Sequence, residues 1–137
     1  MNLLDSRIID LPKINDSRGN LSFFENQKQI PFDIKRTYWI YDVPGGEIRG
    51  RHAFRNSCEF IIALSGSFDV VLNNGDEELR YCLNRSYYGL YVPNLLWRNL
   101  ENFSTNSLAL IVSSIGYNEK DYIKDFDKFK DLRDGIK

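Results

Sequence analysis

Histidine is the residue that this chain of 137 amino acids most nearly lacks, because it contains only His52. Transition-metal centres draw on several imidazoles and carboxylates, and one imidazole leaves too few good ligands, so we expect no metal. Cysteine is also scarce: Cys58 and Cys82 stand alone rather than in the close pairs that zinc sites use. Both lie in strand-like runs, so we expect small buried thiols instead of a disulfide.

Long apolar runs and an excess of one charge are missing too. No segment approaches the length needed to span a membrane, and charged residues begin at Asp5, which argues against a signal peptide. The formal net charge of -1 provides no global field to attract nucleic acid or anionic lipid. We therefore expect a cytoplasmic protein with no nucleic-acid partner and no membrane partner.

Aromatic residues, by contrast, make up 14% of the chain. They favour strands, and short strand-like runs separated by turns rich in glycine follow one another along the sequence. With almost no amphipathic helical stretch before the end, this pattern predicts one all-β domain over residues 1–137, either a sandwich or a barrel. The candidate strands span residues 8–11, 21–25, 36–42, 49–54, 59–64, 68–72, 78–82, 89–92, 96–100 and 108–114.

Only the tail of the chain is expected to be helical. Within residues 121–130, apolar side chains recur at helical spacing at Tyr122, Ile123, Phe126 and Phe129, with charges between them. This spacing predicts a short helix that packs on the rim of the barrel.

The segment around the single histidine is where chemistry is most expected, since the chain has neither a Gly-rich phosphate loop nor a Gly-x-Ser-x-Gly elbow. Strand alternation places His52 and Phe54 on one face, with Arg51 on the other. Three arginines between residues 49 and 55 favour an anion, and Gly50 allows a bulge or a close approach of ligand. From the residues alone, His52 is either an acid–base group or an ordinary structural residue.

Eight blocks occur in a fixed order along most of the chain, at residues 16–19, 36–44, 49–53, 65–70, 89–93, 97–98, 102–104 and 117–125. In these blocks the sequence resembles the nucleotide-sugar 3,4-ketoisomerases, which process dTDP-4-keto-6-deoxyglucose. The resemblance implies a cupin-type double-stranded β-helix (jelly-roll barrel) with a short C-terminal helix. It also implies a homodimer with swapped N-terminal strands, a dTDP-linked keto sugar as substrate, and no cofactor.

The same resemblance implies a reaction. The keto group of the sugar moves from carbon 4 to carbon 3 through an enediolate, for the biosynthesis of 3-amino-3,6-dideoxy sugars of surface glycans such as lipopolysaccharide. His52 matches the position of the base in the family, and a single imidazole can in principle serve both neighbouring carbons. Tyr38 matches an active-site tyrosine that donates to the sugar oxygen or relays its proton.

Further residues are implied to bind the substrate. Arg49 would hold the diphosphate or polarise substrate oxygens, and Arg18 would be a second anchor that reaches the site of a neighbouring subunit. The gluco or galacto configuration of the product is expected to depend on the surroundings of Arg18 and Arg98. The complete substrate-binding set that we predict comprises Arg49, Arg18, Arg98, Trp97 and Arg51.

The chain also departs from the family. Members typically have a second histidine, a lysine and a glutamine where this sequence has Phe54, Arg55 and Glu59. Two alternatives therefore stay open beside the ketoisomerase. One is a nucleotide-sugar 3,5-epimerase, whose Arg-Gly-x-His motif is similar, and the other is a non-catalytic sugar-binding cupin.

Overall fold

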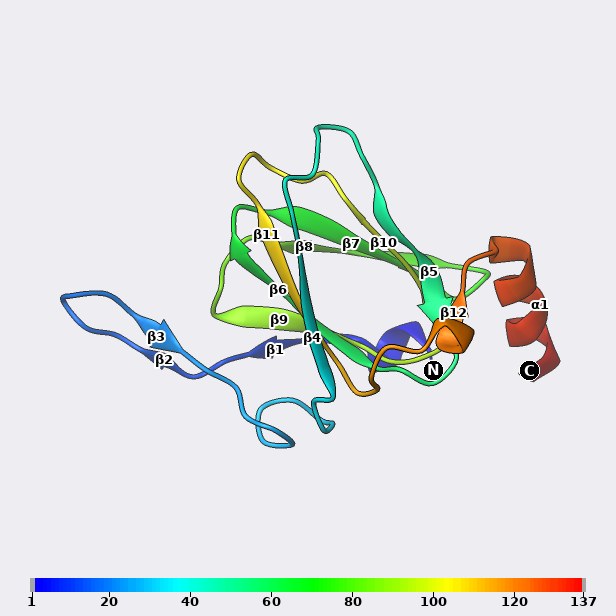
Figure 1. Cartoon of the computed structure of the whole chain (residues 1–137), viewed down its shortest axis with the longest axis horizontal. Helices are drawn as coiled ribbons and strands as arrows, with labels where there is room; N and C mark the ends of the chain where they lie inside the picture. The colour runs from blue at the N-terminus through cyan, green and yellow to red at the C-terminus, as the bar shows by residue number, and fades with distance from the viewer. Residues whose placement is uncertain (1, 137) are drawn as a thin grey trace.

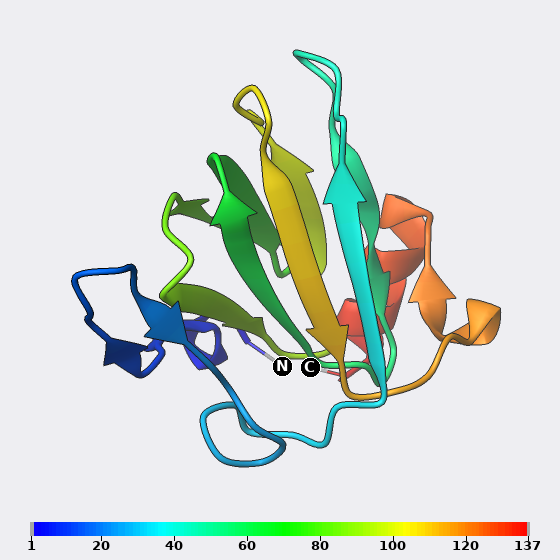
Figure 2. The same cartoon turned by 60° about the vertical axis from the view of Figure 1, so that its left-hand side comes forward.

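The computed structural model of the chain describes residues 2–136 and contains two five-stranded antiparallel sheets that face each other (Figure 1). The first sheet has the order β1 (Arg7–Asp10), β9 (Tyr88–Val92), β6 (Glu59–Ser65), β11 (Leu108–Ser113) and β4 (Arg36–Tyr41). The second has the order β12 (Tyr122–Ile123), β5 (Arg49–Phe54), β10 (Trp97–Glu101), β7 (Phe68–Asn73) and β8 (Glu78–Leu83). In Figure 2, β6, β11 and β4 form the front layer. This arrangement is the predicted all-β cupin barrel.

Each of the ten predicted strands overlaps a strand of the structure. Period-two burial is clearest in β4, whose side chains alternate between half-buried and exposed. The strands β6 and β7 are instead almost continuously buried, because the core and other chain segments cover both of their faces. The main core lies between the two sheets, where the side chains of Leu72, Leu83, Leu90, Leu100 and Ile111 have no exposed surface.

The tail differs from the prediction of a helix over residues 121–130. Residues Glu119–Asp121 form a 3₁₀ turn, Tyr122–Ile123 pair with β5, and the helix α1 spans Phe126–Ile136. The buried carboxylate of Asp121 causes the difference, because it accepts hydrogen bonds from the backbone N–H groups of residues 56 and 57. These bonds hold Tyr122–Ile123, which follow Asp121, extended along β5. The helix begins only after Asp125, whose side chain accepts the N–H of Lys128.

The two short strands β2 (Lys13–Ile14) and β3 (Leu21–Ser22) form a hairpin that projects away from the barrel (Figures 1 and 2). A 3₁₀ turn at Leu3–Asp5 precedes β1 at the N-terminal end. The apolar side chains of Ile14 and Leu21 are each 55% exposed on the hairpin. The hairpin therefore packs little of its apolar surface against its own chain.

Both cysteines are free, as predicted, but the prediction that both are buried was wrong for one of them. Cys58 is half-buried beneath the Tyr91 hydroxyl, whereas Cys82 is exposed on β8. Side chains along β8 alternate, and Cys82 points outward because its neighbour Leu83 occupies the core. Among residues 2–136, no helix is long and apolar enough to cross a membrane.

Candidate active site

His52 lies on β5 and faces the space between the two sheets. It stands opposite Arg98 of β10 in the antiparallel register, so both side chains point to the same face of their sheet. The guanidinium of Arg98 reaches Glu59 and Tyr38 of the facing sheet, which identifies that face as the interior. The imidazole contacts Phe54 at 4.8 Å between ring centroids, as the predicted alternation requires. We call His52, Arg98, Glu59 and Tyr38 the interior cluster.

A bulge in β5 sets the position of this cluster. His52 pairs with Arg98 and Arg49 pairs with Leu100, so two residues of β5 stand opposite one residue of β10. Gly50 occupies the bulge with φ +69°, a conformation that favours glycine. A Cβ at Gly50 would lie 2.4 Å from Nη1 of Arg98. The glycine therefore provides both the bulge and the close approach that the sequence suggested, and it makes room for the arginine.

Arg98, Glu59 and Tyr38 form one buried hydrogen-bond network. The Arg98 and Glu59 residues are each 1% exposed. Nε of Arg98 donates to Oε1 of Glu59 at 2.5 Å, and Nη2 donates to the Tyr38 hydroxyl at 2.9 Å. The Tyr38 hydroxyl in turn donates to Oε2 of Glu59. A buried ion pair is held in place when its remaining donors and acceptors are also satisfied, so this network fixes the guanidinium beside His52.

Two nitrogen atoms of the cluster are buried without a hydrogen-bond partner in the described part of the chain. They are Nε2 of His52 and Nη1 of Arg98. Buried polar atoms are seldom left unpaired, because the loss of hydration is costly. Paired residues of β5 and β10 thus leave one imidazole nitrogen and one permanently protonated donor without a partner, an arrangement suited to a ligand with oxygen atoms.

The surroundings of His52 keep its imidazole neutral. Burial is the largest effect that lowers its pKa, followed by the positive charges of Arg98, Lys124 and Arg36, and together they lower the pKa from 6.5 to about 2. A histidine exposed to water titrates near neutrality instead. The difference arises chiefly because the ring is buried, and three cations from distant parts of the chain add to it. The neutral form, which can accept a proton, is present over the whole ordinary pH range.

The other groups of the cluster also have shifted pKa values. Burial is the main reason that the pKa of Tyr38 is raised, and its hydroxyl therefore stays protonated at ordinary pH. For Arg98, burial is the largest single effect and lowers the pKa, but the charge of Glu59 together with the hydrogen bonds to Glu59 and Tyr38 outweighs it and the pKa is raised. The cluster thus combines a fixed positive charge, a neutral phenol and a neutral imidazole.

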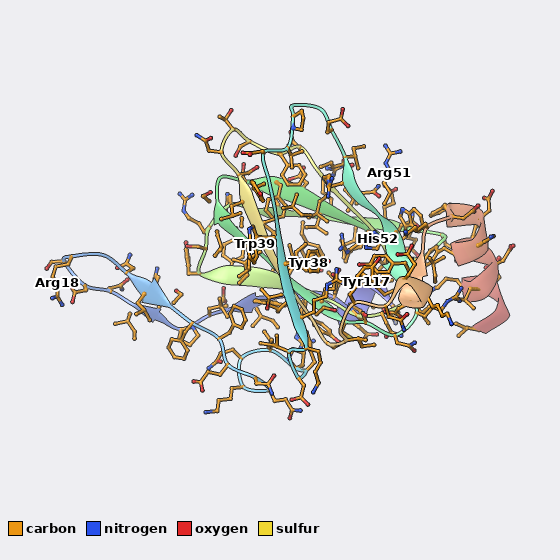
Figure 3. All side chains as sticks on the ribbon, in the orientation of Figure 1. Arg18, Tyr38, Trp39, Arg51, His52 and Tyr117 are labelled. Atoms are coloured by element: carbon orange, nitrogen blue, oxygen red, sulfur yellow. The ribbon has the colours of Figure 1, made fainter. Side chains whose placement is uncertain are left out.

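A second layer of aromatic and cationic side chains, which the sequence analysis did not identify, borders the cluster. The guanidinium of Arg36 lies 4.4 Å from the ring centroid of Tyr38 and donates to the Tyr122 hydroxyl at 2.9 Å. The Tyr122 ring lies 4.9 Å from His52. In Figure 3, Tyr38, His52 and Tyr117 lie on the same side of the barrel. Arg36 could have been found from alternation, since it shares a strand face with Tyr38.

The structure brings Tyr38 and Arg98 to His52, but not the other predicted substrate-binding residues. Arg49 and Arg51 are exposed on β5. Trp97 packs on the opposite face of β10 against Phe126 and Phe129 of α1. Because neighbouring residues of a strand point to opposite faces, Trp97 cannot face the interior when Arg98 does. The predicted contribution of Trp97 to the sugar pocket is therefore corrected to packing of the helix.

Arg18 lies at the tip of the β2–β3 hairpin, far from His52 (Figure 3). Its side chain is 88% exposed, and it donates to both carboxylate oxygens of Asp16 at 2.9 Å. The site around His52 in the same chain therefore does not include Arg18.

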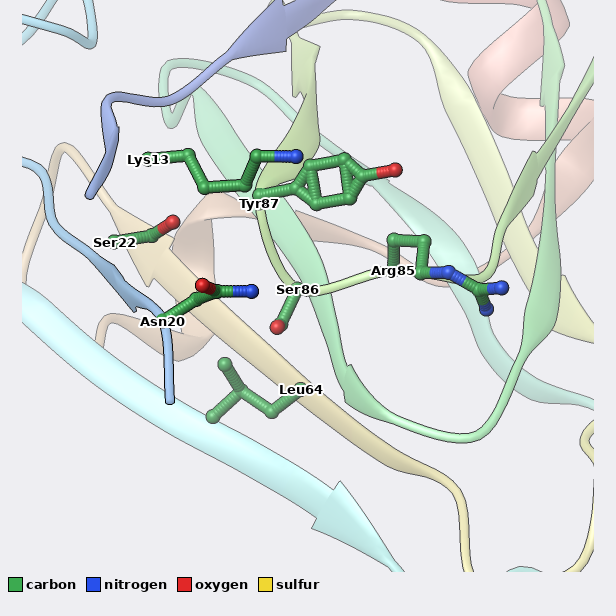
Figure 4. Close-up of a pocket in the computed structure, with 7 residues that line it drawn as sticks. All are labelled: Lys13, Asn20, Ser22, Leu64, Arg85, Ser86 and Tyr87. Carbon is green, nitrogen blue, oxygen red and sulfur yellow. The ribbon is translucent and has the colours of Figure 1, made fainter. Parts of the chain in front are cut away.

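A cavity of about 460 Å³ lies between this hairpin and the loop that leads into β9 (Figure 4). The Lys13 ammonium lies 4.2 Å from the centroid of the Tyr87 ring in its wall. Its lining residues are Lys13, Asn20, Ser22, Leu64, Arg85, Ser86 and Tyr87. None of these belongs to the interior cluster. Within residues 2–136, no group of three or more His, Cys, Asp or Glu side chains is placed to hold a metal ion.

Comparison with known proteins identifies close relatives. The family model described as FdtA, WxcM-like, C-terminal, matches residues 4–134. The chain is 38% identical over 127 residues to the TDP-4-oxo-6-deoxy-α-D-glucose-3,4-oxoisomerase of Aneurinibacillus thermoaerophilus, and the match covers 93% of this chain and 91% of that protein. A 3,4-ketoisomerase from Helicobacter canadensis has a TM-score of 0.92 at 39% identity, covering 95% of this chain and 98% of the other.

The sugar 3,4-ketoisomerase QdtA from Thermoanaerobacterium thermosaccharolyticum, solved with TDP, has a TM-score of 0.95 at 34% identity and covers 98% of both chains. A variant of that protein was solved with TDP-4-keto-6-deoxyglucose. The dTDP-4-dehydrorhamnose 3,5-epimerase of Bacillus anthracis has a TM-score of 0.77 at 16% identity, covering 89% of this chain and 79% of the other. That last likeness concerns the fold alone.

Proposed function

Because this chain belongs to the FdtA family of WxcM-like proteins, we propose that it is a sugar 3,4-ketoisomerase that acts on TDP-4-keto-6-deoxyglucose. The observation that carries the proposal is the pair of unpartnered nitrogens at the interior cluster, Nε2 of His52 and Nη1 of Arg98. A neutral base beside a fixed cation is what the formation of an enediolate from a keto sugar needs. The 3-keto product would serve the biosynthesis of 3-amino-3,6-dideoxy sugars of surface glycans in the cytoplasm.

The reaction begins with removal of the proton on carbon 3 by the neutral imidazole of His52. The electron pair of that bond forms the carbon 3–carbon 4 double bond, and the carbonyl electrons move onto the oxygen of carbon 4. Nη1 of Arg98 is the donor available to that oxygen. The imidazolium then returns its proton to carbon 4. The negative charge on the enediolate favours the charged form of His52 while the intermediate exists.

Incubation with the 4-keto-6-deoxy nucleotide sugar in heavy water tests this function. We expect the 3-keto product with deuterium at carbon 4. Exchange at carbon 5 with epimerisation would instead identify a 3,5-epimerase. Binding of the nucleotide sugar with no isotope exchange at any carbon would identify a non-catalytic sugar-binding protein. This outcome is worth testing because Phe54 stands where members of the family typically have a second histidine.

We also propose that the chain forms a homodimer in which the N-terminal hairpin reaches the partner. Exposed apolar residues on the hairpin, Ile14 and Leu21, support this assembly, as do Trp39 and Tyr41 on β4 at the edge of the first sheet. In such a dimer, Arg18 of one protomer would bind the nucleotide sugar at the site of the other. Sedimentation that shows only monomer at micromolar concentration would contradict the assembly.

Complementation between two impaired variants, assayed at a substrate concentration well below the KM of Arg18→Ala, tests the exchange of Arg18 directly. A heterodimer of one Arg18→Ala protomer and one His52→Asn protomer would contain one complete site only if Arg18 acts on the neighbouring protomer. We expect this heterodimer to recover about half of the wild-type activity, because one of its two equivalent sites is intact. If Arg18 acts within its own chain, neither site is complete and activity stays at the level of the two parent variants.

A further inference from the structure

Moving a carbonyl between neighbouring carbons also requires that a hydroxyl proton pass from the oxygen of carbon 3 to the oxygen of carbon 4. His52 is already engaged with the carbon proton, and Arg98 does not release a proton at ordinary pH. Within the interior cluster, the remaining carboxylate is that of Glu59. We propose that Glu59, acting through the Tyr38 hydroxyl, holds the hydroxyl proton between the two oxygens. This inference rests on the proposed ketoisomerase function.

The hydrogen bonds of the network already form this path. Oε2 of Glu59 accepts the Tyr38 hydroxyl, so the phenolic proton points toward the carboxylate. The Tyr38 oxygen accepts Nη2 of Arg98 at 2.9 Å and retains one lone pair for a sugar hydroxyl. Glu59 is 1% exposed, so water does not compete for its oxygens. A proton that reaches Tyr38 therefore has the carboxylate as its next acceptor.

Tyr38 alone is poorly suited to this transfer. Its pKa is raised, chiefly by burial, so a free phenolate is costly inside the barrel. With Glu59 as acceptor, the phenol can take one proton while it gives up another, and it never becomes a phenolate. Glu59 is therefore a positioning and relay residue that acts through Tyr38 and does not itself touch the sugar.

The proposed transfer has two steps that balance. In the first, the proton of the carbon 3 hydroxyl moves to the Tyr38 oxygen while the phenolic proton moves to Oε2 of Glu59. In the second, the carboxylic acid returns that proton to Tyr38 while Tyr38 protonates the oxygen of carbon 4. Between the steps, the two negative charges on the sugar face the imidazolium of His52 and the guanidinium of Arg98. Tyr38 and Glu59 end in their starting states.

Glu59→Gln tests the inference, because glutamine keeps the shape of the side chain and one accepting oxygen but is not a proton acceptor of comparable basicity. Exchange of deuterium into carbon 3 of the remaining substrate reports on His52, whereas formation of the 3-keto product also needs the hydroxyl transfer. We expect the exchange rate to stay within about threefold of wild type while product formation falls roughly 100-fold or more. A matched control is Glu101→Gln, since Glu101 pairs with Arg80 outside the cluster and both rates should be unchanged.

Tyr38→Phe keeps the test decisive if Glu59→Gln fails to fold, and Phe54→His adds a rescue experiment where Glu59→Gln is folded. Tyr38→Phe retains the Glu59–Arg98 ion pair but removes the relay hydroxyl, so the same separation of exchange from product formation is expected. Phe54→His in the Glu59→Gln background places a second imidazole where the Phe54 ring now lies, 4.8 Å from His52. This new proton carrier should restore product formation by about tenfold or more.

The outcomes separate this inference from the proposed function. Product formation by Glu59→Gln within about threefold of wild type would overturn the relay. A parallel loss of exchange and product formation in Glu59→Gln and Tyr38→Phe would also overturn it, since that pattern indicates a structural role only. If the wild-type protein shows neither exchange nor product, the proposed ketoisomerase function is refuted. That result comes from the wild-type protein alone and needs no variant.

Discussion

The interior cluster and the β2–β3 hairpin each contain an arginine that the sequence analysis predicted to bind the substrate, Arg98 and Arg18, and the two arginines are held in opposite ways. Around His52, the charges are buried and joined by several hydrogen bonds that span both sheets. On the hairpin, the side chain of Arg18 is held, among residues 2–136, by Asp16 alone, two residues away. The difference supports our proposal that the barrel fixes the reacting groups within one chain, while the hairpin presents Arg18 to the site of the partner.

The physical reason for this difference is the surrounding solvent. A buried charge that loses its partner is costly, so the geometry of Arg98 and Glu59 is strongly determined. An exposed pair such as Arg18 and Asp16 is screened and contributes little to stability. Substitutions in the interior cluster should therefore lower the catalytic rate strongly, and some should lower the stability of the protein as well. Substitutions in the hairpin should weaken only the binding of substrate.

The largest effect is expected for His52→Asn, which removes the base of the barrel site and keeps a polar side chain. General base catalysis typically contributes about 100-fold to 10,000-fold, so we expect kcat to fall within that range. Binding of TDP should be nearly unchanged, as measured by calorimetry, because the phosphates are not held by the imidazole. A fully active His52→Asn protein would return the histidine to the status of an ordinary strand residue.

Gly50→Ala should have the next largest effect, because it breaks the fit between the bulge and Arg98. The new methyl group would lie 2.4 Å from Nη1 of Arg98, at a residue with φ +69°. The positive φ alone costs alanine roughly 1–2 kcal/mol, and the displaced guanidinium should lower kcat/KM by about 10-fold to 100-fold. Thermal unfolding and steady-state kinetics measure the two effects.

Gly46→Ala is the matched control for Gly50→Ala. Gly46 also has a positive φ, +84°, but no atom lies within 4 Å of the Cβ that alanine would add. It should show the loss of stability that comes from the backbone conformation without the loss of activity. Equal activity losses in the two variants would contradict the importance of the close contact with Arg98.

The sequence predicted features that depend on neighbouring residues, and it missed those that depend on distant ones. Alternation placed His52 and Phe54 on one face, and the glycine of β5 indicated the bulge. The pairing of Arg98 with Glu59 joins strands 39 residues apart, which no local pattern encodes. The two-residue strand β12 and the late start of α1 likewise depend on Asp121. Its carboxylate accepts hydrogen bonds from the backbone of Asn56 and Ser57, more than 60 residues earlier in the chain.

A smaller effect is expected from pH, again through the barrel. The pKa of His52 is about 2 in the folded chain and near 6.5 when unfolded. Between these values the unfolded chain binds a proton that the folded chain does not, so stability is complete above pH 6.5 and falls as the pH decreases. From pH 7 to 5 we expect a loss of roughly 1–2 kcal/mol, after allowance for partial solvent access. Urea denaturation should show a smaller loss for His52→Asn, and equal losses would contradict the lowered pKa.

The smallest effect is expected for Asp16→Asn on the hairpin, which sharpens the contrast with the barrel. The carboxylate accepts three hydrogen bonds from Arg18, and these lower the pKa of Asp16 to about 2. Both residues are nevertheless exposed, and exposed ion pairs contribute little, so thermal unfolding should be indistinguishable from wild type.

Asp16→Asn should still weaken substrate binding slightly, since the carboxylate orients the guanidinium that we propose for the partner's site. We expect KM to rise by about twofold to threefold with kcat unchanged, a change of the size that one exposed ion pair provides. Arg18→Ala should raise KM further, because it removes the cation rather than its orientation. If Asp16→Asn instead lowered the melting temperature as much as Gly50→Ala, the hairpin would be as rigidly built as the barrel, and the contrast between the two regions would be refuted.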